Sequence, residues 1–252
     1  MKNWFTQRSG WKLRIKILIL LFCFLTQSGR AQTCDRQRDS LALVALYNST
    51  NGPNWSVTWD LNQPINAWYG VELNDAGCLR SLILNNNGLK GSIPPEIGNF
   101  ENVLQIKMDD NALVGSLPDK LYDLALIETL SLLNNQLSGE LSSIVDHLKS
   151  IGTLNLMGNQ FSGPIPKEIG NLHHITWLGL NNNQFSGEIP HEIGQLTTLG
   201  SLWASFNQLS GPIPEEFGNM VNLSQLTLSQ NNLSGGIPSS LGNLPNLTFL
   251  YL

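Results

Sequence analysis

The feature that most constrains this chain is a 24-residue repeat, which begins at Leu79 and continues without insertion to Leu252. Seven units are complete, and the eighth stops after six residues. The fifth unit begins Ile175-Thr-Trp-Leu-Gly-Leu-Asn-Asn-Asn and continues Gln-Phe-Ser-Gly-Glu-Ile-Pro190. A single unit of this size cannot bury its apolar side chains, whereas stacked units can. The repeat therefore predicts one elongated solenoid over residues 79–252.

Each unit has two halves with different patterns. The first half alternates, as in Leu178-Gly-Leu180, and this predicts a short strand with one buried face. Stacking would align these strands in a parallel sheet. The second half carries an apolar pair such as Ile169 and Leu172, which predicts a short helical return under the sheet.

The position that follows each strand is Asn in every complete unit. An amide has two donor hydrogens and an acceptor oxygen, so it can satisfy backbone groups at the bend of its own unit and of the next. Each such group would cost about 1–3 kcal/mol if it were buried without a partner. We therefore predict a structural ladder, with no catalytic role, for Asn87, Asn111, Asn135, Asn159, Asn183, Asn207 and Asn231.

The consensus LxxLxLxxNxLSGxIPxxLGxLxx resembles the plant-type class of leucine-rich repeats. That class occurs in plant receptor kinases, receptor-like proteins and polygalacturonase-inhibiting proteins, and in secreted bacterial and algal proteins. The resemblance covers 79–252 and implies an α/β solenoid, a right-handed superhelix with a concave parallel β-sheet and an N-terminal cap. It also implies a second short strand near the Ser-Gly-x-Ile-Pro stretch. The third unit departs from the consensus at Ser142 and Asp146, where we expect a local distortion.

The first 31 residues have the layout of a secretory signal peptide, with basic residues, an apolar run at 17–25, and Gly29 and Ala31 before a cut at Gln32. A membrane anchor is the alternative, but nine helical residues rise only about 13 Å against roughly 30 Å of hydrocarbon. The chain is therefore expected to be secreted or at the cell surface. After cleavage, eight basic and 19 acidic side chains remain, a net charge of −11 that disfavours nucleic acid as a partner.

Residues 32–78 lack the repeat and are predicted to cap its first end. Residues 39–47 read as a helix with Asp35 or Asp39 as N-cap, residues 69–73 as a strand, and residues 74–77 as a turn. Three tryptophans, at positions 55, 59 and 68, have two readings: side chains that fill the cap, or a platform for carbohydrate.

Catalytic and metal-binding constellations are not evident in the sequence, and no cofactor or metal is expected. All four histidines (His147, His173, His174 and His191) fall in the return half of their units, away from the strand face. The adjacent pair Asp109-Asp110 has the composition of a solvated edge more than of a cation site.

The leading hypothesis is an extracellular module that recognises a protein or peptide ligand, because solenoid curvature creates extended concave surfaces. An inhibitor or regulator of a secreted enzyme, and a structural or adhesive cell-surface protein, remain alternatives. An enzyme is disfavoured. The open strand at the end of the eighth unit predicts either a longer gene product or pairing with another chain.

Residues between the strand leucines should face the concave surface, and aromatic side chains gather in its late strands. We predict that Trp177 and Trp203 anchor the ligand, with Asn181, Ser205 and Gln225 as a polar rim. The alternative is that these rings only pack on one another. The proposed ligand-binding set is Met157, Trp177, Asn181, Trp203, Ser205, Phe206, Gln225 and Phe249.

One prediction concerns the two cysteines that remain after cleavage, Cys34 and Cys78, which we expect to be bonded in an oxidising compartment. Closing a loop of this length contributes about 4 kcal/mol in the chain-entropy model. Intact-mass analysis of the secreted chain after alkylation without reductant should find an N-terminus at Gln32 and no modified thiol. Two alkylated thiols would refute the bond.

Overall fold

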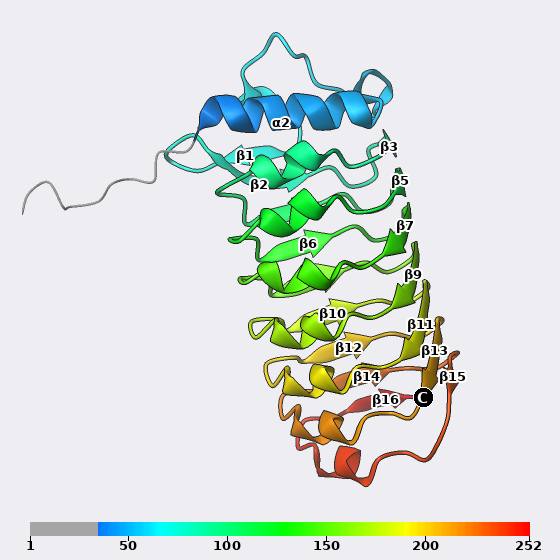
Figure 1. The fold of residues 1–252 in the computed structure, drawn as a ribbon. Coiled ribbons are helices and arrows are strands. Elements are labelled where there is room, and N and C mark those ends of the chain that lie inside the picture. The colour runs from blue at the N-terminus through cyan, green and yellow to red at the C-terminus, as the bar shows by residue number, and fades with distance from the viewer. Residues whose placement is uncertain (1–34) are drawn as a thin grey trace, which may run out of the picture. The chain divides into compact units, whose positions relative to one another are not determined.

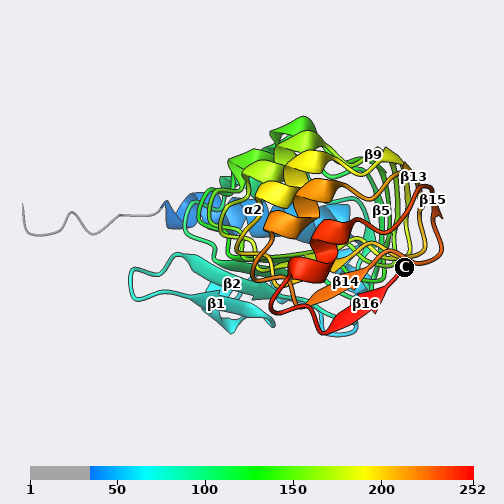
Figure 2. The ribbon, with the colours of Figure 1, turned by 90° about the horizontal axis from the view of Figure 1, so that it is seen from below.

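The computed structural model describes residues 35–252, which form a single stack of coils (Figure 1). The predicted signal peptide and Cys34 lie outside the described residues, so the cleavage and the Cys34–Cys78 bond stay predictions. Each 24-residue unit makes one turn of the solenoid, as the repeat predicts. Seen along the stack in Figure 2, each coil has the sheet on one side and the helical returns on another.

A nine-stranded sheet runs the length of the stack and forms its concave side. Its first pair is antiparallel and every later pair is parallel, with equivalent residues of successive units in register, such as Trp177 beside Ser201. Its strands are β1 (Val71–Leu73), β2 (Leu79–Ile83), β4 (Gln105–Lys107), β6 (Thr129–Ser131), β8 (Thr153–Asn155), β10 (Trp177–Gly179), β12 (Ser201–Trp203), β14 (Gln225–Thr227) and β16 (Phe249–Tyr251).

A second parallel sheet of seven strands follows the bend of each coil. Most of its strands span the Gln-Leu/Phe-Ser-Gly segment, and so overlap the start of the Ser-Gly-x-Ile-Pro stretch near which the resemblance implied a second strand. Its strands are β3 (Lys90–Gly91), β5 (Ala112–Gly115), β7 (Gln136–Glu140), β9 (Gln160–Pro164), β11 (Gln184–Glu188), β13 (Gln208–Gly211) and β15 (Asn232–Leu233).

The return of each coil is a five-residue 3₁₀ turn, and each begins just after the Pro of the consensus or its substitute. Because residues of one face recur every three positions in a 3₁₀ turn, each turn buries only one or two apolar side chains. These turns are η3 (Pro95–Asn99), η4 (Asp119–Asp123), η5 (Ser143–His147), η6 (Lys167–Asn171), η7 (His191–Gln195), η8 (Glu215–Asn219) and η9 (Ser239–Asn243).

The asparagine column joins successive coils by hydrogen bonds. In the fourth unit, Asn159 Nδ2 donates to the carbonyl oxygens of Leu156 at 3.1 Å and of Leu132 in the preceding unit at 2.9 Å. Its Oδ1 accepts from the backbone N–H of Leu137 at 3.0 Å, also in the preceding unit. Units two to seven repeat this arrangement, and Asn87 in the first unit instead bonds both backbone groups of Val57. The ladder therefore continues into the segment before the repeats.

The distortion expected in the third unit does not occur. Ser142 has φ −66° and ψ 145°, close to the −67° and 135° of Pro166 one unit later. Serine can adopt the conformation to which proline is restricted, so the turn still begins in place. Its backbone N–H, which proline would lack, lies 3.4 Å from Tyr122 Oη, and the fully buried Tyr122 ring occupies a column that is Gly in most units.

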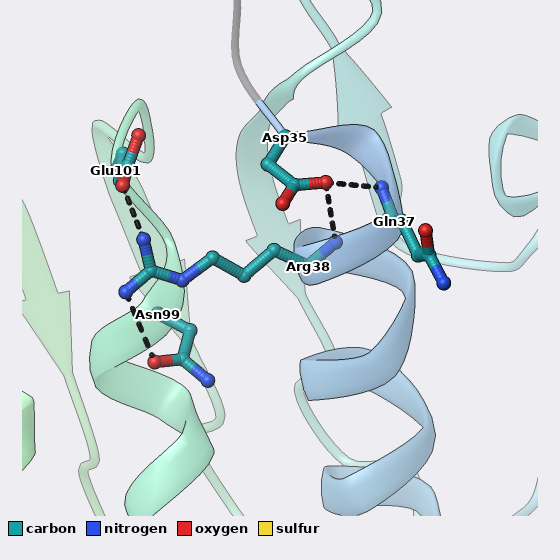
Figure 3. Close-up of polar contacts among 5 residues, drawn as sticks. All are labelled: Asp35, Gln37, Arg38, Asn99 and Glu101. Carbon is teal, nitrogen blue, oxygen red and sulfur yellow. Dashed lines mark hydrogen bonds and ion pairs between the residues drawn. The ribbon is translucent and has the colours of Figure 1, made fainter.

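Residues 35–78 lie against the first coil (Figure 1). Helix α2 (Arg36–Ser49) begins at Asp35, whose carboxylate accepts from the N–H groups of Gln37 and Arg38. Figure 3 shows Arg38 reaching from α2 to Glu101 and to Asn99 in the first repeat. Two 3₁₀ turns follow, η1 (Gly52–Asn54) and η2 (Ile65–Ala67).

The three tryptophans of this segment are buried, so the carbohydrate-platform reading of these rings is wrong. Trp55, Trp59 and Trp68 are 4%, 3% and 5% exposed. The centroids of successive rings are 4.8 Å apart, with an edge-to-face contact between Trp55 and Trp59 and a stacked one between Trp59 and Trp68. Each indole N–H donates to a backbone carbonyl, as buried indoles usually do. They extend the apolar core of the repeats into residues 35–78, whose role as a cap stays a prediction.

The ladder generates a prediction for Asn159→Ala. The substitution leaves two buried carbonyl groups and one buried N–H without their side-chain partner, so it should lower the free energy of unfolding by about 2–4 kcal/mol. Urea denaturation measures this loss. Asn219→Ala is the matched control, because Asn219 is exposed, its side chain makes no hydrogen bond within the described residues, and its φ is not positive. Equal stability of the two variants would contradict the role of the ladder.

A second prediction concerns Asp39, which is 3% exposed and accepts a bond from the Leu79 N–H at 2.7 Å. Burial raises the pKa of this carboxyl above 3.8, and the negative charges of Glu101 and Asp35 act in the same direction, against the Leu79 N–H and Arg38. The folded chain therefore holds this proton more tightly than the unfolded chain does. The resulting stability is complete below pH 3.8 and is lost as the pH rises through the raised pKa.

Asn at position 39 can accept the same bond but cannot ionise. Asp39→Asn should therefore raise the melting temperature at pH 7 relative to the unmodified chain, with a difference that shrinks toward pH 4. Asp60→Asn is a control in which the pKa shift has the opposite sign, because the N–H and side chain of Asn62 lower the pKa of this exposed carboxyl. Thermal denaturation at several pH values measures both, and a constant difference for Asp39→Asn would refute the effect.

Candidate binding surface on the concave sheet

The concave sheet presents an uncharged surface from β6 to β16. Leucines such as Leu130 and Leu178 point into the core and are fully buried, so the residues that alternate with them project from the opposite face. On the last six strands these residues carry hydroxyl, amide, aromatic or aliphatic groups. Charged residues occur earlier in the sheet, at Glu72 on β1, Arg80 on β2, and Lys107 and Asp109 in the second unit.

Two tryptophans project side by side from neighbouring strands. The rings of Trp177 on β10 and Trp203 on β12 have centroids 5.7 Å apart and planes tilted by 56°. The Trp177 ring lies over Gly179, where a Cβ would come within 2.3 Å of it and within 3.0 Å of Met157 Cγ. The glycine thus provides room for the indole, a role that sequence reasoning did not assign. Both rings are partly exposed.

A hollow of about 430 Å³ opens beyond Trp203, over β12, β14 and β16. Six of the eight predicted residues line it; Trp177 packs against the lining residue Trp203, and Met157 lies near Gly179, one strand further from the hollow. Three others in the same register columns were not predicted as site residues, although their columns pointed to them. The lining consists of Asn181, Trp203, Ser205, Phe206, Gln225, Thr227, Ser229, Phe249 and Tyr251.

Hydrogen bonds orient part of this lining. Trp203 Nε1 donates to Gln225 Oε1 at 3.2 Å, which leaves the Gln225 amide hydrogens directed away from that bond. Ser229 Oγ donates to Ser205 Oγ at 3.1 Å, and Ser205 is only 3% exposed. Ser205 therefore belongs to the floor of the hollow, and its predicted place on a polar rim is wrong. The Ser205 side chain is buried because Ser229 of the next unit supplies its hydroxyl partner.

Thr227 lies between two aromatic side chains in register, Trp203 on one neighbouring strand and Tyr251 on the other. It is 7% exposed, and its Oγ1 is buried without a hydrogen-bond partner. Among the described side chains the same is true only of Asn102 Nδ2. A buried hydroxyl without a partner is costly, so the group has an unused capacity to bond within the wall of the hollow.

The acidic and histidine residues considered in the sequence analysis lie in positions where they support the fold or face the return side of a coil. Asp109 accepts from Ser131 Oγ at 2.5 Å and from the Leu133 N–H at 2.9 Å, so it joins two units and is more than a solvated edge. His191 begins η7, on the return side of its coil. No cluster of three or more potential metal ligands occurs within residues 35–252. In the same part of the chain, no helix has the length and hydropathy of a membrane span.

A model of the leucine-rich repeat matches five of the units, at residues 78–100, 150–172, 174–196, 198–220 and 222–244. The chain is 32% identical over 86 residues to polygalacturonase inhibitor 2 of Arabidopsis thaliana, a match that covers 33% of this chain and 26% of the inhibitor. These matches support a plant-type leucine-rich-repeat family for the chain. The third unit, with Ser142 and Asp146, is among those that the model does not match.

Several solved structures superpose along most of this chain. The PEPR1–AtPEP1 structure has a TM-score of 0.79 and 29% identity, with 85% of this chain and 31% of that one covered. The HAESA receptor kinase ectodomain of Arabidopsis with its peptide hormone has a TM-score of 0.71 and 27% identity, with 86% and 41% covered. A plant ice-binding protein has a TM-score of 0.75 and 26% identity, with 88% and 79% covered.

The similarities cover only part of the length of the receptors and of the inhibitor. The chain spans less than half the length of the two receptors and about a quarter of the inhibitor. The shared part includes the stack of coils that carries the concave sheet, so the likeness concerns the scaffold of the candidate surface. The similar proteins differ in what their names say they bind, in keeping with the rule that a fold does not determine its ligand.

Proposed function

We propose that the chain is an extracellular recognition module that binds a peptide, or an extended segment of a protein, along its concave sheet. The observation that carries this proposal is the pair Trp177 and Trp203, exposed in part, 5.7 Å apart, and next to a hollow whose lining is uncharged. Large aromatic side chains dominate binding energy at protein interfaces, because they bury much area at little cost in conformational entropy.

The comparisons support the same function. The HAESA ectodomain, similar along 86% of this chain, is described in complex with a peptide hormone ligand. A peptide that follows the sheet would cross several strands, and each strand would offer it hydroxyl or amide groups from a different unit. Recognition without catalysis is the expectation for this family, and we propose no catalytic residue.

An extracellular location is part of the proposal and depends on the signal-like residues 1–31. The acidic balance of the remaining chain favours ligands that are neutral or basic overall, since like charges repel on approach. A bound carbohydrate is the minor alternative, now on the concave aromatic rings, because the tryptophans of residues 35–78 are buried.

The proposal predicts the effect of Trp177→Ala and Trp203→Ala on peptides selected from a random phage-displayed library against the purified chain. Each truncation should weaken binding about 30-fold, equivalent to roughly 2 kcal/mol, because the ring buries its area only in the complex. The melting temperature should change little, because both rings are partly exposed in the free protein. Calorimetric titration and thermal denaturation measure the two quantities.

Tyr69→Ala is the matched control, because Tyr69 is an aromatic side chain, 47% exposed, that lies outside the concave strands of the repeats and outside the hollow. Its truncation should leave the affinity unchanged. Peptides that bind equally well to all three variants would place the binding surface elsewhere on the molecule.

A second candidate function, inhibition of a polygalacturonase, is favoured by the 86-residue match to polygalacturonase inhibitor 2. It has less support, because that match covers a third of the chain and a quarter of the inhibitor. Mixing the purified chain with polygalacturonases and measuring the release of reducing sugar tests it directly. Inhibition that survives Trp203→Ala would assign this function to another surface.

A further inference from the structure

Phe206 occupies a backbone position that does not suit it. The residue before each ladder asparagine has a positive φ between 48° and 65°, in every complete repeat. Asparagine, aspartate and glycine tolerate this left-handed conformation best, and most repeats have one of them: Asn86, Asp110, Asn134, Gly158 and Asn182. Phe206 has φ 56° and is the one aromatic residue in the column.

The Phe206 ring also contributes little to the packing of the fold. It is 52% exposed, and it stacks on no other aromatic ring within residues 35–252. Both the conformation and the exposure are unfavourable for a bulky apolar side chain. Residues held in such conformations cluster at ligand contacts, where binding compensates for the strain. The ring lines the hollow beside Trp203.

The chemistry of the hollow defines what can enter it. Trp203, Phe206, Phe249 and Tyr251 give it flat apolar walls, and the parallel rings of Phe249 and Tyr251 are 6.4 Å apart. No acidic or basic side chain lines it, although the chain has 19 acidic residues. A charged group would lose its hydration here without gaining a counter-ion, whereas an uncharged ring would stack on the walls.

The hollow also has polar groups for a ligand. Thr227, whose buried Oγ1 has no partner, is among its lining residues, and the Gln225 amide has donor hydrogens beyond its bond from Trp203. An uncharged ring that carries a hydroxyl or amide group can fill the hollow and provide the missing partner. Phenylalanine-like side chains satisfy the walls alone, and tyrosine-like side chains satisfy both.

We infer that this hollow receives one uncharged aromatic side chain of the bound peptide, and that Phe206 is retained at a strained position to select it. The inference rests on the proposed function, since it names the group that the concave surface recognises. It adds that stability and binding oppose each other at Phe206 and at Thr227. A residue with a purely structural role would not show this opposition.

The test uses Phe206→Asn, which restores the residue type of the other repeats. It should raise the melting temperature by about 3 °C through relief of strain, and it should weaken binding of the library-selected peptides at least 10-fold.

Thr227→Val, which replaces the unpartnered hydroxyl with a methyl group, should also raise the melting temperature. It should weaken binding of peptides with a tyrosine at the selected position about fivefold, and of those with phenylalanine much less.

The peptides provide an independent readout. They should share an aromatic residue at one position, and its replacement with Glu should reduce the affinity at least 10-fold. Asn134→Phe is the matched control, because it places phenylalanine in the same backbone column three repeats earlier, outside the hollow. It should lower the melting temperature and leave the affinity unchanged.

The outcomes separate this inference from the proposed function. If no peptide is enriched, the proposed function fails, and the inference fails with it. If peptides bind and lose affinity with Trp203→Ala but not with Phe206→Asn, the proposed function stands and the inference is wrong. A fall in the melting temperature with Phe206→Asn would assign the ring to the fold and would also overturn the inference.

Discussion

The hydrogen bonds of the ladder asparagines are the interaction on which the rest of the structure depends. A coil of 24 residues must bend sharply after its concave strand, and the bend leaves backbone groups without partners inside the stack. Asn159 bonds carbonyl groups of its own unit and of the unit before it, and it accepts an N–H from that earlier unit. Each coil is thereby joined to its neighbour at the same depth, which explains why no insertion interrupts the period.

This constraint also creates the left-handed column beside the ladder. Every bend requires a positive φ at the preceding residue, whatever side chain the sequence places there. The fold therefore imposes a standard conformation, and a departure from the favoured residue types becomes informative. Phe206 departs at the place where the concave surface is also hollow and uncharged. The coincidence of an unfavourable residue, an unpartnered Thr227 hydroxyl and adjacent exposed rings supports a recognition role better than any of these features alone.

The concave surface shows how a repeat scaffold separates stability from recognition. Residues that alternate along each strand point either into the core or away from it, so the leucines support the stack while the intervening residues are free to vary. Gly179 illustrates the freedom, since the absence of a side chain on β10 leaves room for the Trp177 ring. The buried Trp59 illustrates the opposite case, where an aromatic residue outside the repeats serves the core and is unavailable to a ligand.

The sequence by itself determined the period, the strands, the asparagine column and the columns that face outward, because all of these follow from local alternation repeated at a constant interval. It also indicated that Trp177 and Trp203 lie on neighbouring strands. The tertiary structure decided what depends on partners far along the chain. Ser205 is buried because Ser229 meets it from the next coil, and Ser142 keeps its turn in place without proline. The missing partner of Thr227 could be recognised only with both flanking strands in place, because hydrogen-bond satisfaction is a property of packed neighbours and not of residue type.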